Sequence, residues 1–346
     1  MLFRALLATA VAATSAVGQT DLERLLEELT ASGEIVGAQM LIGNGGETEA
    51  ERNFGAVAPG SDREVGPETR FCIGSVSKPL ASSVVLSLVN DGSLALDKPV
   101  SQWLEGFDKP PTLRQLLSHH GGVYSQRDGM TDAQTRWIRD FRLTLKEAVD
   151  GILGEEQSSE PGSRYAYSGA GYCVVGRLAE IASGRSMEEL LQRRLAGPLG
   201  MSRTTYFPAP SDADVATGRS EETPHLLGED LQLPLIGGSI YSTARDLARF
   251  ARMMAGRGKL GSSRVMPRKL WREMISHSGF TEQQYALGWS IEPRTMQVRH
   301  NGALAASRAA LRIDLESGRY VIALYSLGEN GGKAQARVTQ AATDAL

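Results

Sequence analysis

The sequence has few of the residues that build metal centres and disulfide frameworks. Its 346 residues include 2 cysteines and 5 histidines, and none of them cluster at the spacing of metal ligands. We therefore predict no metal and no cofactor. Cys72 and Cys173 lie in or beside segments that we expect to be buried helices, and unpaired cysteine is among the most buried residue types. We favour two free core thiols over a disulfide.

Runs of charge of one sign are also missing. The chain has 37 Lys and Arg against 40 Asp and Glu, a net charge of −3 and a pI near 6.0, and the charges are interspersed. Without a basic stretch, we predict no nucleic-acid partner and no acidic-membrane partner. A hydrophobic fraction of 41% is that of an ordinary globular protein with a sizeable core.

Beyond the first residues the chain lacks an apolar run long enough to cross a membrane. A short positive start precedes an alanine-rich run over 5–17, which is itself too short to span a bilayer. Small residues at the end of this run suit signal peptidase, so we predict a signal peptide over residues 1–18 with cleavage before Gln19. The alternative is an uncleaved anchor. Cleavage implies an exported protein, periplasmic or secreted.

Periodicity and turn residues predict strands at both ends of the chain and helices between them. Asn44-Gly45 is a strong hairpin signal between two of the strands. The predicted strands cover 35–42, 47–57, 285–291, 296–300, 308–315 and 319–327, and the predicted helices cover 21–32, 75–90, 112–118, 142–153, 171–183, 186–195, 243–255, a short segment after Pro267 and 333–346.

This order predicts an α+β fold, an antiparallel sheet flanked by helices and built from the N- and C-terminal segments, with an inserted, mostly helical region. We assign 19–97 and 236–346 to the α/β sheet subdomain, and 98–235 to a helical subdomain that carries the substrate-specificity loops. Within it, 203–235 has four prolines and little periodicity, as is typical of a functional or mobile loop.

Ser75-Val76-Ser77-Lys78 stands where a strand-like segment gives way to a helix. The i, i+3 spacing puts Ser75 and Lys78 on one helix face. Pro79 is tolerated only in a first turn, so it places the helix start close to Ser75. N–H groups and the positive dipole end then point at the serine oxygen, which favours a nucleophile. Alone the motif is weak, because it recurs by chance about once in a chain of this size.

Two further groups strengthen the case for a catalytic site. Tyr167 falls in a small-residue loop before a helix, where its phenol can point into a cleft, although a core aromatic is the plainer interpretation. His300-Asn301-Gly302-Ala303 ends a predicted strand, and a glycine there allows close approach to a ligand, although a simple turn would also explain it.

In this order the three groups resemble the serine hydrolase superfamily of class C β-lactamases, DD-peptidases (penicillin-binding proteins) and related esterases, whose pattern is Ser-x-x-Lys, Tyr-x-Asn and Lys/His-x-Gly. The resemblance runs from Phe54 to Tyr325 and includes supporting stretches that begin at Thr112, Pro161 and Gly237. It implies the fold of that superfamily and hydrolysis of a small-molecule ester, amide or peptide-like substrate.

The resemblance also implies the catalytic roles. Ser75 would be the nucleophile that forms an acyl-enzyme, with Lys78 and Tyr167 sharing the proton transfer. The backbone N–H groups of Ser75 and Ala303 would form the oxyanion hole. Lysine is almost entirely charged at neutral pH, and a helix N-terminus alone disfavours the cation by only ~0.3–2 kcal/mol. Either burial makes Lys78 the base, or a charged Lys78 helps Tyr167 ionise, so we treat the two as one coupled unit.

The residues that we predict to contact the substrate depart from the superfamily pattern. His300, Asn301 and Gly302 would line the strand against which the substrate lies, and Gly169 stands where the β-lactamases and peptidases carry an asparagine that contacts the acylamide. Glycine cannot make that contact, and histidine binds a carboxylate less strongly than lysine. Both changes favour ester hydrolysis over an efficient β-lactamase.

Two alternative functions remain open. A DD-peptidase or weak β-lactamase is the alternative within the class, and a catalytically retired binding or scaffold protein of the same fold is the alternative outside it. We expect His119 and His120 to be packing residues more than proton carriers, and Trp289 to be core more than a substrate platform. The sequence does not indicate an oligomeric state.

Overall fold

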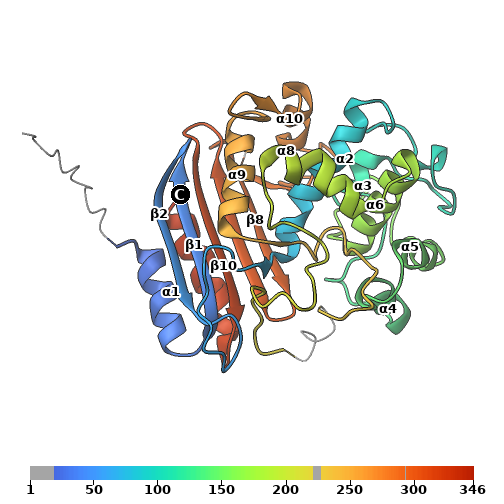
Figure 1. The fold of residues 1–346 in the computed structure, drawn as a ribbon. Coiled ribbons are helices and arrows are strands. Elements are labelled where there is room, and N and C mark those ends of the chain that lie inside the picture. The colour runs from blue at the N-terminus through green and yellow to red at the C-terminus, as the bar shows by residue number, and fades with distance from the viewer. Residues whose placement is uncertain (1–18, 221–226, 293) are drawn as a thin grey trace, which may run out of the picture.

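A six-stranded antiparallel sheet is the centre of the computed structural model, which describes residues 19–220, 227–292 and 294–346 (Figure 1). The strand order is β2-β1-β10-β9-β8-β7. The strands are β1 (Ile35–Asn44), β2 (Glu47–Gly55), β7 (Ser290–Glu292), β8 (Gln297–Leu304), β9 (Ser307–Asp314) and β10 (Arg319–Leu327). Two come from the start of the chain and four from its end, which confirms the predicted α+β class.

The pairing of β1 with β10 joins the two ends of the chain in one sheet. The strands run antiparallel, with Leu41 opposite Ile322 and Met40 opposite Ala323. β10 is buried from Tyr320 to Ser326. Its nearly continuous apolar sequence suits a strand covered on both faces, which explains its place inside the sheet.

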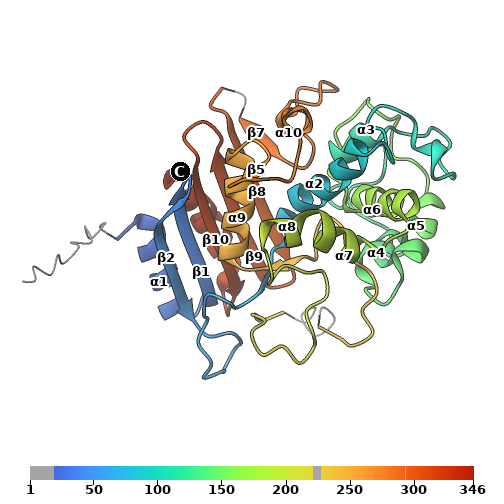
Figure 2. The same ribbon diagram turned by 45° about the horizontal axis from the view of Figure 1, so that its top comes forward.

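Helices cover both faces of the sheet. α1 (Asp21–Ala31) and α11 (Ala334–Asp344) pack side by side on one face, where Leu22 and Val338 share a core with Val321. α9 (Ala244–Ala255) lies across the other face against β1 and β10, as Figures 1 and 2 show. Thr243 caps α9 by accepting a hydrogen bond from the Asp246 N–H.

Most of the remaining helices form a second body beside the sheet (Figure 2), while the short η5 leads into α11. α2 (Ser77–Asn90) lies between the two parts and packs on α6 and α10. The other elements are η1 (Gly74–Val76), η2 (Val100–Gln102), α3 (Leu113–Leu117), α4 (Asp132–Arg139), α5 (Leu145–Leu153), α6 (Gly169–Ser183), α7 (Met187–Leu191), η3 (Gln192–Ala196), α8 (Gly197–Leu199), α10 (Arg268–Ile275), η5 (Gly331–Lys333) and the short pairs β3 (Phe71–Cys72) with β4 (Tyr241–Ser242) and β5 (Lys259–Leu260) with β6 (Ser263–Arg264).

The structure corrects several predicted elements. The strand expected over 285–291 is only β7, because the chain turns tightly before it at Gly288, whose φ is +93°. The strand expected to end at His300 continues to Leu304, so the His300-Asn-Gly group lies inside β8. α4 was not predicted, although Thr131 and Gln134 form a capping box at its start.

Both cysteines are buried free thiols. Burial raises the pKa of Cys72 and that of Cys173 to about 12, so neither is reactive at neutral pH. Across the described ranges no helix has the length and apolarity needed to cross a membrane, and the predicted signal peptide over 1–18 lies outside those ranges.

Candidate active site

Ser75 and Lys78 lie where a short 3-10 turn leads into α2. Ser75 is in η1, and Lys78 is in the first turn of the helix that follows. The Lys78 Nζ atom donates to the Ser75 Oγ at 3.1 Å and to the carbonyl oxygen of Gly237 at 2.8 Å. Lys78 is only 1% exposed. The predicted nucleophile is thus hydrogen-bonded to an amine that is almost completely removed from water.

Gly237 makes room for this amine. A Cβ atom added at Gly237 would lie 2.9 Å from the Cγ and 3.0 Å from the Nζ of Lys78. The neighbouring chain is held by Ser77, whose Oγ accepts a hydrogen bond from the Ile240 N–H. The segment that returns from the helical body therefore covers Lys78 and supplies one of its acceptors.

Tyr167 lies beside the lysine, in the loop before α6. The Lys78 Nζ is 4.6 Å from the centroid of the Tyr167 ring, and the Arg127 guanidinium carbon is 4.2 Å from the same centroid. The structure therefore brings together the three side chains that the sequence predicts to be catalytic, and it adds a second cation that the sequence did not suggest.

The oxyanion hole predicted at Ser75 and Ala303 requires the turn before α2 to approach β8 closely. Gly74 has a φ of +51°, and a Cβ atom there would lie 2.3 Å from the backbone nitrogen of Ala303. A Cβ atom at Gly302 would lie 1.9 Å from the carbonyl oxygen of Ile73. The two glycines thus allow the backbones to touch, which places Ala303 beside the residue that precedes Ser75.

His300 is buried and neutral. Its Nδ1 donates to the carbonyl oxygen of Asn301 at 2.8 Å, so its Nε2 is the acceptor for the Tyr285 hydroxyl at 3.0 Å. Burial, helped by the charge of Lys78, lowers the pKa of His300 to about 3. Neither nitrogen is left to bind a charged group, which sharpens the difference from a lysine at this position.

The side chain of Asn301 lies on the opposite face of β8, contrary to its predicted role in lining the substrate strand. Its Oδ1 accepts a hydrogen bond at 2.8 Å from Arg312, a buried arginine that also donates to Thr343 in α11. Side chains alternate along a strand, so if His300 and Gly302 face the site, Asn301 cannot. Only its backbone can contribute there.

Gln126 fills the space beside Gly169, and the sequence alone did not indicate this. Its Oε1 accepts a hydrogen bond from the Gly169 N–H at 2.8 Å, and a Cβ atom at Gly169 would lie 3.5 Å from the amide of Gln126. A carboxamide is therefore present next to the position where the superfamily pattern has an asparagine, but it comes from a loop 43 residues earlier in the chain.

His119 lies in a cage of aromatic rings next to Tyr167. The ring centroids of His119 and Tyr167 are 4.3 Å apart, and the His119 Nδ1 accepts a hydrogen bond from the Ser168 N–H. Burial lowers the pKa of His119 well below its usual value, and its Nε2 has no partner among the residues the structure describes. His120 instead contacts Ser118 and Thr281.

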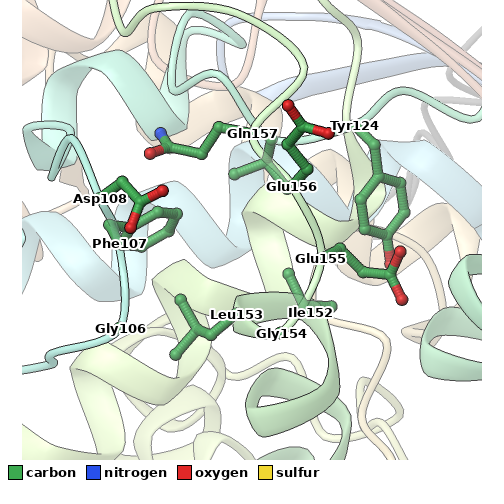
Figure 3. Close-up of a pocket in the computed structure, with 11 residues that line it drawn as sticks. Gly106, Phe107, Asp108, Tyr124, Ile152, Leu153, Gly154, Glu155, Glu156 and Gln157 are labelled. Atoms are coloured by element: carbon green, nitrogen blue, oxygen red, sulfur yellow. The ribbon is translucent and has the colours of Figure 1, made fainter.

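Other features lie apart from this site. Trp289 is buried, with its ring stacked on Phe250, so the structure places it in the core. A cavity of about 300 Å³ lies between the end of α5, with the segment that follows it, and the loop around Asp108, and it carries the carboxylates of Asp108, Glu155 and Glu156 (Figure 3). None of the three predicted catalytic side chains lines it. In the described part of the chain no three His, Cys, Asp or Glu residues form a metal-binding group.

A serine bonded to a buried lysine, with a tyrosine ring beside both, is the arrangement of a serine hydrolase. The chain belongs to the Beta-lactamase family, whose profile matches residues 22–345. The solved octameric penicillin-binding protein homologue from Pyrococcus abyssi has the same fold, with a TM-score of 0.75 and 23% identity over 90% of this chain and 73% of that one.

Two curated relatives are similar in sequence. Esterase EstB from Burkholderia gladioli is 28% identical over 234 residues, which are 63% of this chain and 59% of the esterase. The putative penicillin-binding protein PbpX from Bacillus subtilis (strain 168) is 24% identical over 305 residues, which are 86% of this chain and 72% of that protein. The chain thus spans less than two thirds of the esterase's length.

Proposed function

We propose that this protein is an exported serine hydrolase that cleaves small ester substrates through an acyl-enzyme on Ser75. The observation that carries the proposal is the hydrogen bond from the buried Lys78 amine to the Ser75 hydroxyl, with Tyr167 against the same amine. A hydroxyl is a weak nucleophile until a neighbouring base takes its proton, and this arrangement supplies the base.

The proposed reaction has two stages. The Lys78–Tyr167 unit takes the Ser75 proton as the Oγ attacks the ester carbonyl, and the N–H groups of Ser75 and Ala303 hold the negative charge on the carbonyl oxygen. The carbonyl re-forms as the alcohol leaves with the proton. Water then attacks the acyl-enzyme and gives a proton to the same unit. As the acid is released, the unit passes this proton to the leaving Ser75 Oγ, which returns Ser75 to its starting form.

Ester substrates suit the site better than amides. Gly169 offers no side chain to an acylamide, and the neutral His300 has both nitrogens occupied. One relative is named an esterase, which supports this choice. A DD-peptidase or weak β-lactamase is the second candidate, favoured by the Gln126 carboxamide beside Gly169 and by the relatives named penicillin-binding proteins.

Labelling of Ser75 tests the proposal against a retired scaffold. Intact-mass spectrometry after treatment with a fluorophosphonate should show one adduct, and Ser75→Ala should show none. A folded wild-type protein that takes up no label would contradict enzymatic function. A screen with short p-nitrophenyl esters, nitrocefin and D-Ala-D-Ala peptides then separates the candidates, and nitrocefin or peptide turnover faster than ester turnover would favour the second one.

Export rests on the predicted signal peptide over 1–18. Expressed with its own leader in a Gram-negative host, the protein should be recovered from the periplasm with the mass of a chain that begins at Gln19. Ala16→Glu should block cleavage, because signal peptidase requires a small residue at this position. Full-length protein in the cytoplasm of the wild-type culture would contradict export.

A further inference from the structure

Arg127 has a charged side chain at the active site. Neither the proposed reaction nor the family pattern assigns it a role. Its guanidinium carbon lies 4.2 Å from the centroid of the Tyr167 ring, on the residue predicted to share the proton transfer. Its loop is anchored just before this contact. The Arg127 N–H donates to the Ser125 Oγ at 3.1 Å, and Gln126 holds the Gly169 N–H at the start of α6. The cation is therefore positioned at the site by its own backbone.

The guanidinium has no anionic partner in the ranges the structure describes. The next residue, Asp128, is paired with Arg164 instead. The ring contact uses the charge of Arg127 and none of its N–H donors, since no hydrogen bond from this side chain is present within those same ranges. Arginine presents a planar fork of N–H donors that matches a carboxylate bidentately. The fork is exposed and available to a ligand.

The other side chains that could supply a positive charge at the site either have hydrogen-bond partners already or are uncharged. Lys78 is buried and donates to Ser75 and Gly237. His300 is uncharged, with Asn301 and Tyr285 on its two nitrogens. Arg312 is bonded to Asn301 on the other face of β8. Within the part of the chain that the structure describes, Arg127 is left as the cation that can meet a negative group on a substrate lying against Ser75.

We infer that Arg127 is a specificity-determining residue that binds a carboxylate on the substrate and so selects anionic esters over neutral ones. The inference rests on the proposed function, since it names the substrate class of the same site. The substrate-binding cation is then Arg127, which lies on the loop after α3 and over the ring of Tyr167. β8 contributes the neutral His300 instead of a cation.

Paired esters test the inference, because each pair differs only in a carboxylate. One pair is p-nitrophenyl hexanoate and mono-p-nitrophenyl adipate, with the charge on the acyl group. The other is phenyl acetate and 3-carboxyphenyl acetate, with the charge on the leaving group. Arg127→Gln should lower kcat/KM at least ten-fold more for the charged ester than for its neutral partner in one of the pairs, mainly through KM. Arg127→Lys should retain part of the preference.

Arg136→Gln is the matched control, because it removes one positive charge from another exposed arginine that lies over an aromatic ring, that of Trp137, and it leaves the Asp128–Arg164 pair intact. It should leave the ratio within each pair unchanged. The wild-type preference should also weaken between 0.05 and 0.5 M NaCl, and the Arg127→Gln ratios should not, since salt screens an exposed ion pair.

Equal losses on all four esters would overturn the inference and assign Arg127 to the support of Tyr167. Unchanged ratios in both pairs would overturn it as well. Failure of the proposed function has a different signature: wild-type protein that cleaves no ester and takes no fluorophosphonate on Ser75, an outcome that would remove both.

Discussion

Lys78 combines two properties that rarely occur together in a lysine. It is 1% exposed, and it donates to a serine and a carbonyl with no carboxylate partner among the described residues. A buried amine is expensive to keep charged, so the fold maintains it for chemistry and not for stability. Lys78→Met should therefore slow acylation of Ser75 by at least about 10³-fold, the scale of lost general-base catalysis.

The same variant should not destabilise the protein. Methionine has a similar length and no charge to bury, so the urea midpoint should stay the same or rise. Stopped-flow acylation and urea unfolding measure the two effects separately. A Lys78→Met protein that is acylated at the wild-type rate, or one that loses activity only because it unfolds, would contradict this account.

Gly237 tests how finely the amine is positioned. Alanine there would put a Cβ atom about 3 Å from three atoms of Lys78. A displacement near 1 Å at a reacting group can reduce the rate about 10²-fold, so we expect a loss of kcat of that order with KM little changed. Gly66→Ala is the matched control, since its added Cβ would meet nothing within 4 Å. Equal kinetics for the two variants would contradict the steric argument.

His300 makes stability depend on pH. Its pKa is about 3 in the folded protein and near 6.5 when unfolded, so between these values the unfolded chain binds a proton that the folded protein excludes. The free energy of unfolding should fall as the pH drops below 6.5, by up to about 1.4 kcal/mol per pH unit from this residue.

His300→Gln should remove that contribution, because glutamine can donate to Asn301 and accept from Tyr285 without titrating. Urea unfolding of both proteins at several pH values from 7.5 to 4 gives the two slopes. The exposed His277 provides the control, and His277→Gln should keep the wild-type slope. Identical slopes for wild type and His300→Gln would show that another group causes the pH dependence.

Local sequence was enough to predict Ser75 and Lys78 as a pair, because i, i+3 spacing and Pro79 fix their relation within one helical turn. It was not enough for Gln126 and Arg127. They belong to a loop whose relation to Tyr167 is set by tertiary contacts, such as the bond from Gly169 to Gln126 across 43 positions. The Tyr285 hydroxyl on His300 was missed for the same reason.

At the scale of elements, the crossing of η1 over β8 is the contact that assembles the predicted oxyanion hole. Gly74→Ala combines a positive φ with a clash against the backbone of Ala303, which cannot move without moving β8. We expect a loss of about 2–4 kcal/mol in unfolding free energy and a fall in kcat of at least about 10²-fold.

Gly45→Ala separates the two causes of that loss. Gly45 also has a positive φ, at +54°, but a Cβ atom there would meet nothing within 4 Å. This variant should lose only about 1 kcal/mol and keep its activity. Urea unfolding and ester kinetics on both variants are the measurement, and similar effects at the two positions would mean that the approach of η1 to β8 is unimportant.

Elements with strong periodicity could be predicted, and those that depend on their neighbours could not. β10 and α9 were predicted from apolar patterning and a cap, and the structure has both. β8 extends past His300 because β9 continues to pair with it as far as Leu304. No pattern within residues 296–300 carries that information.

For the whole molecule, the sheet divides the described residues into two apolar cores. The smaller one, under α1 and α11, contains Leu26, Tyr325 and Val338 and none of the predicted catalytic residues. The larger one joins the sheet to the helical body and surrounds the site. The strands at both ends of the chain indicated this architecture, while the contacts across the join followed only from the three-dimensional structure.

The bond between Lys78 and Gly237 has a consequence for when the protein becomes reactive. It joins residues 159 positions apart, and closing a loop of that length costs about 4–5 kcal/mol of chain entropy. Ser75 and Lys78 leave the ribosome long before Gly237, and until that carbonyl arrives the amine lacks one of the two hydrogen bonds that hold it in place beside Ser75. Latency is therefore a property of the topology, and a nascent chain carries Ser75 as an ordinary serine at least until the loop to Gly237 has closed.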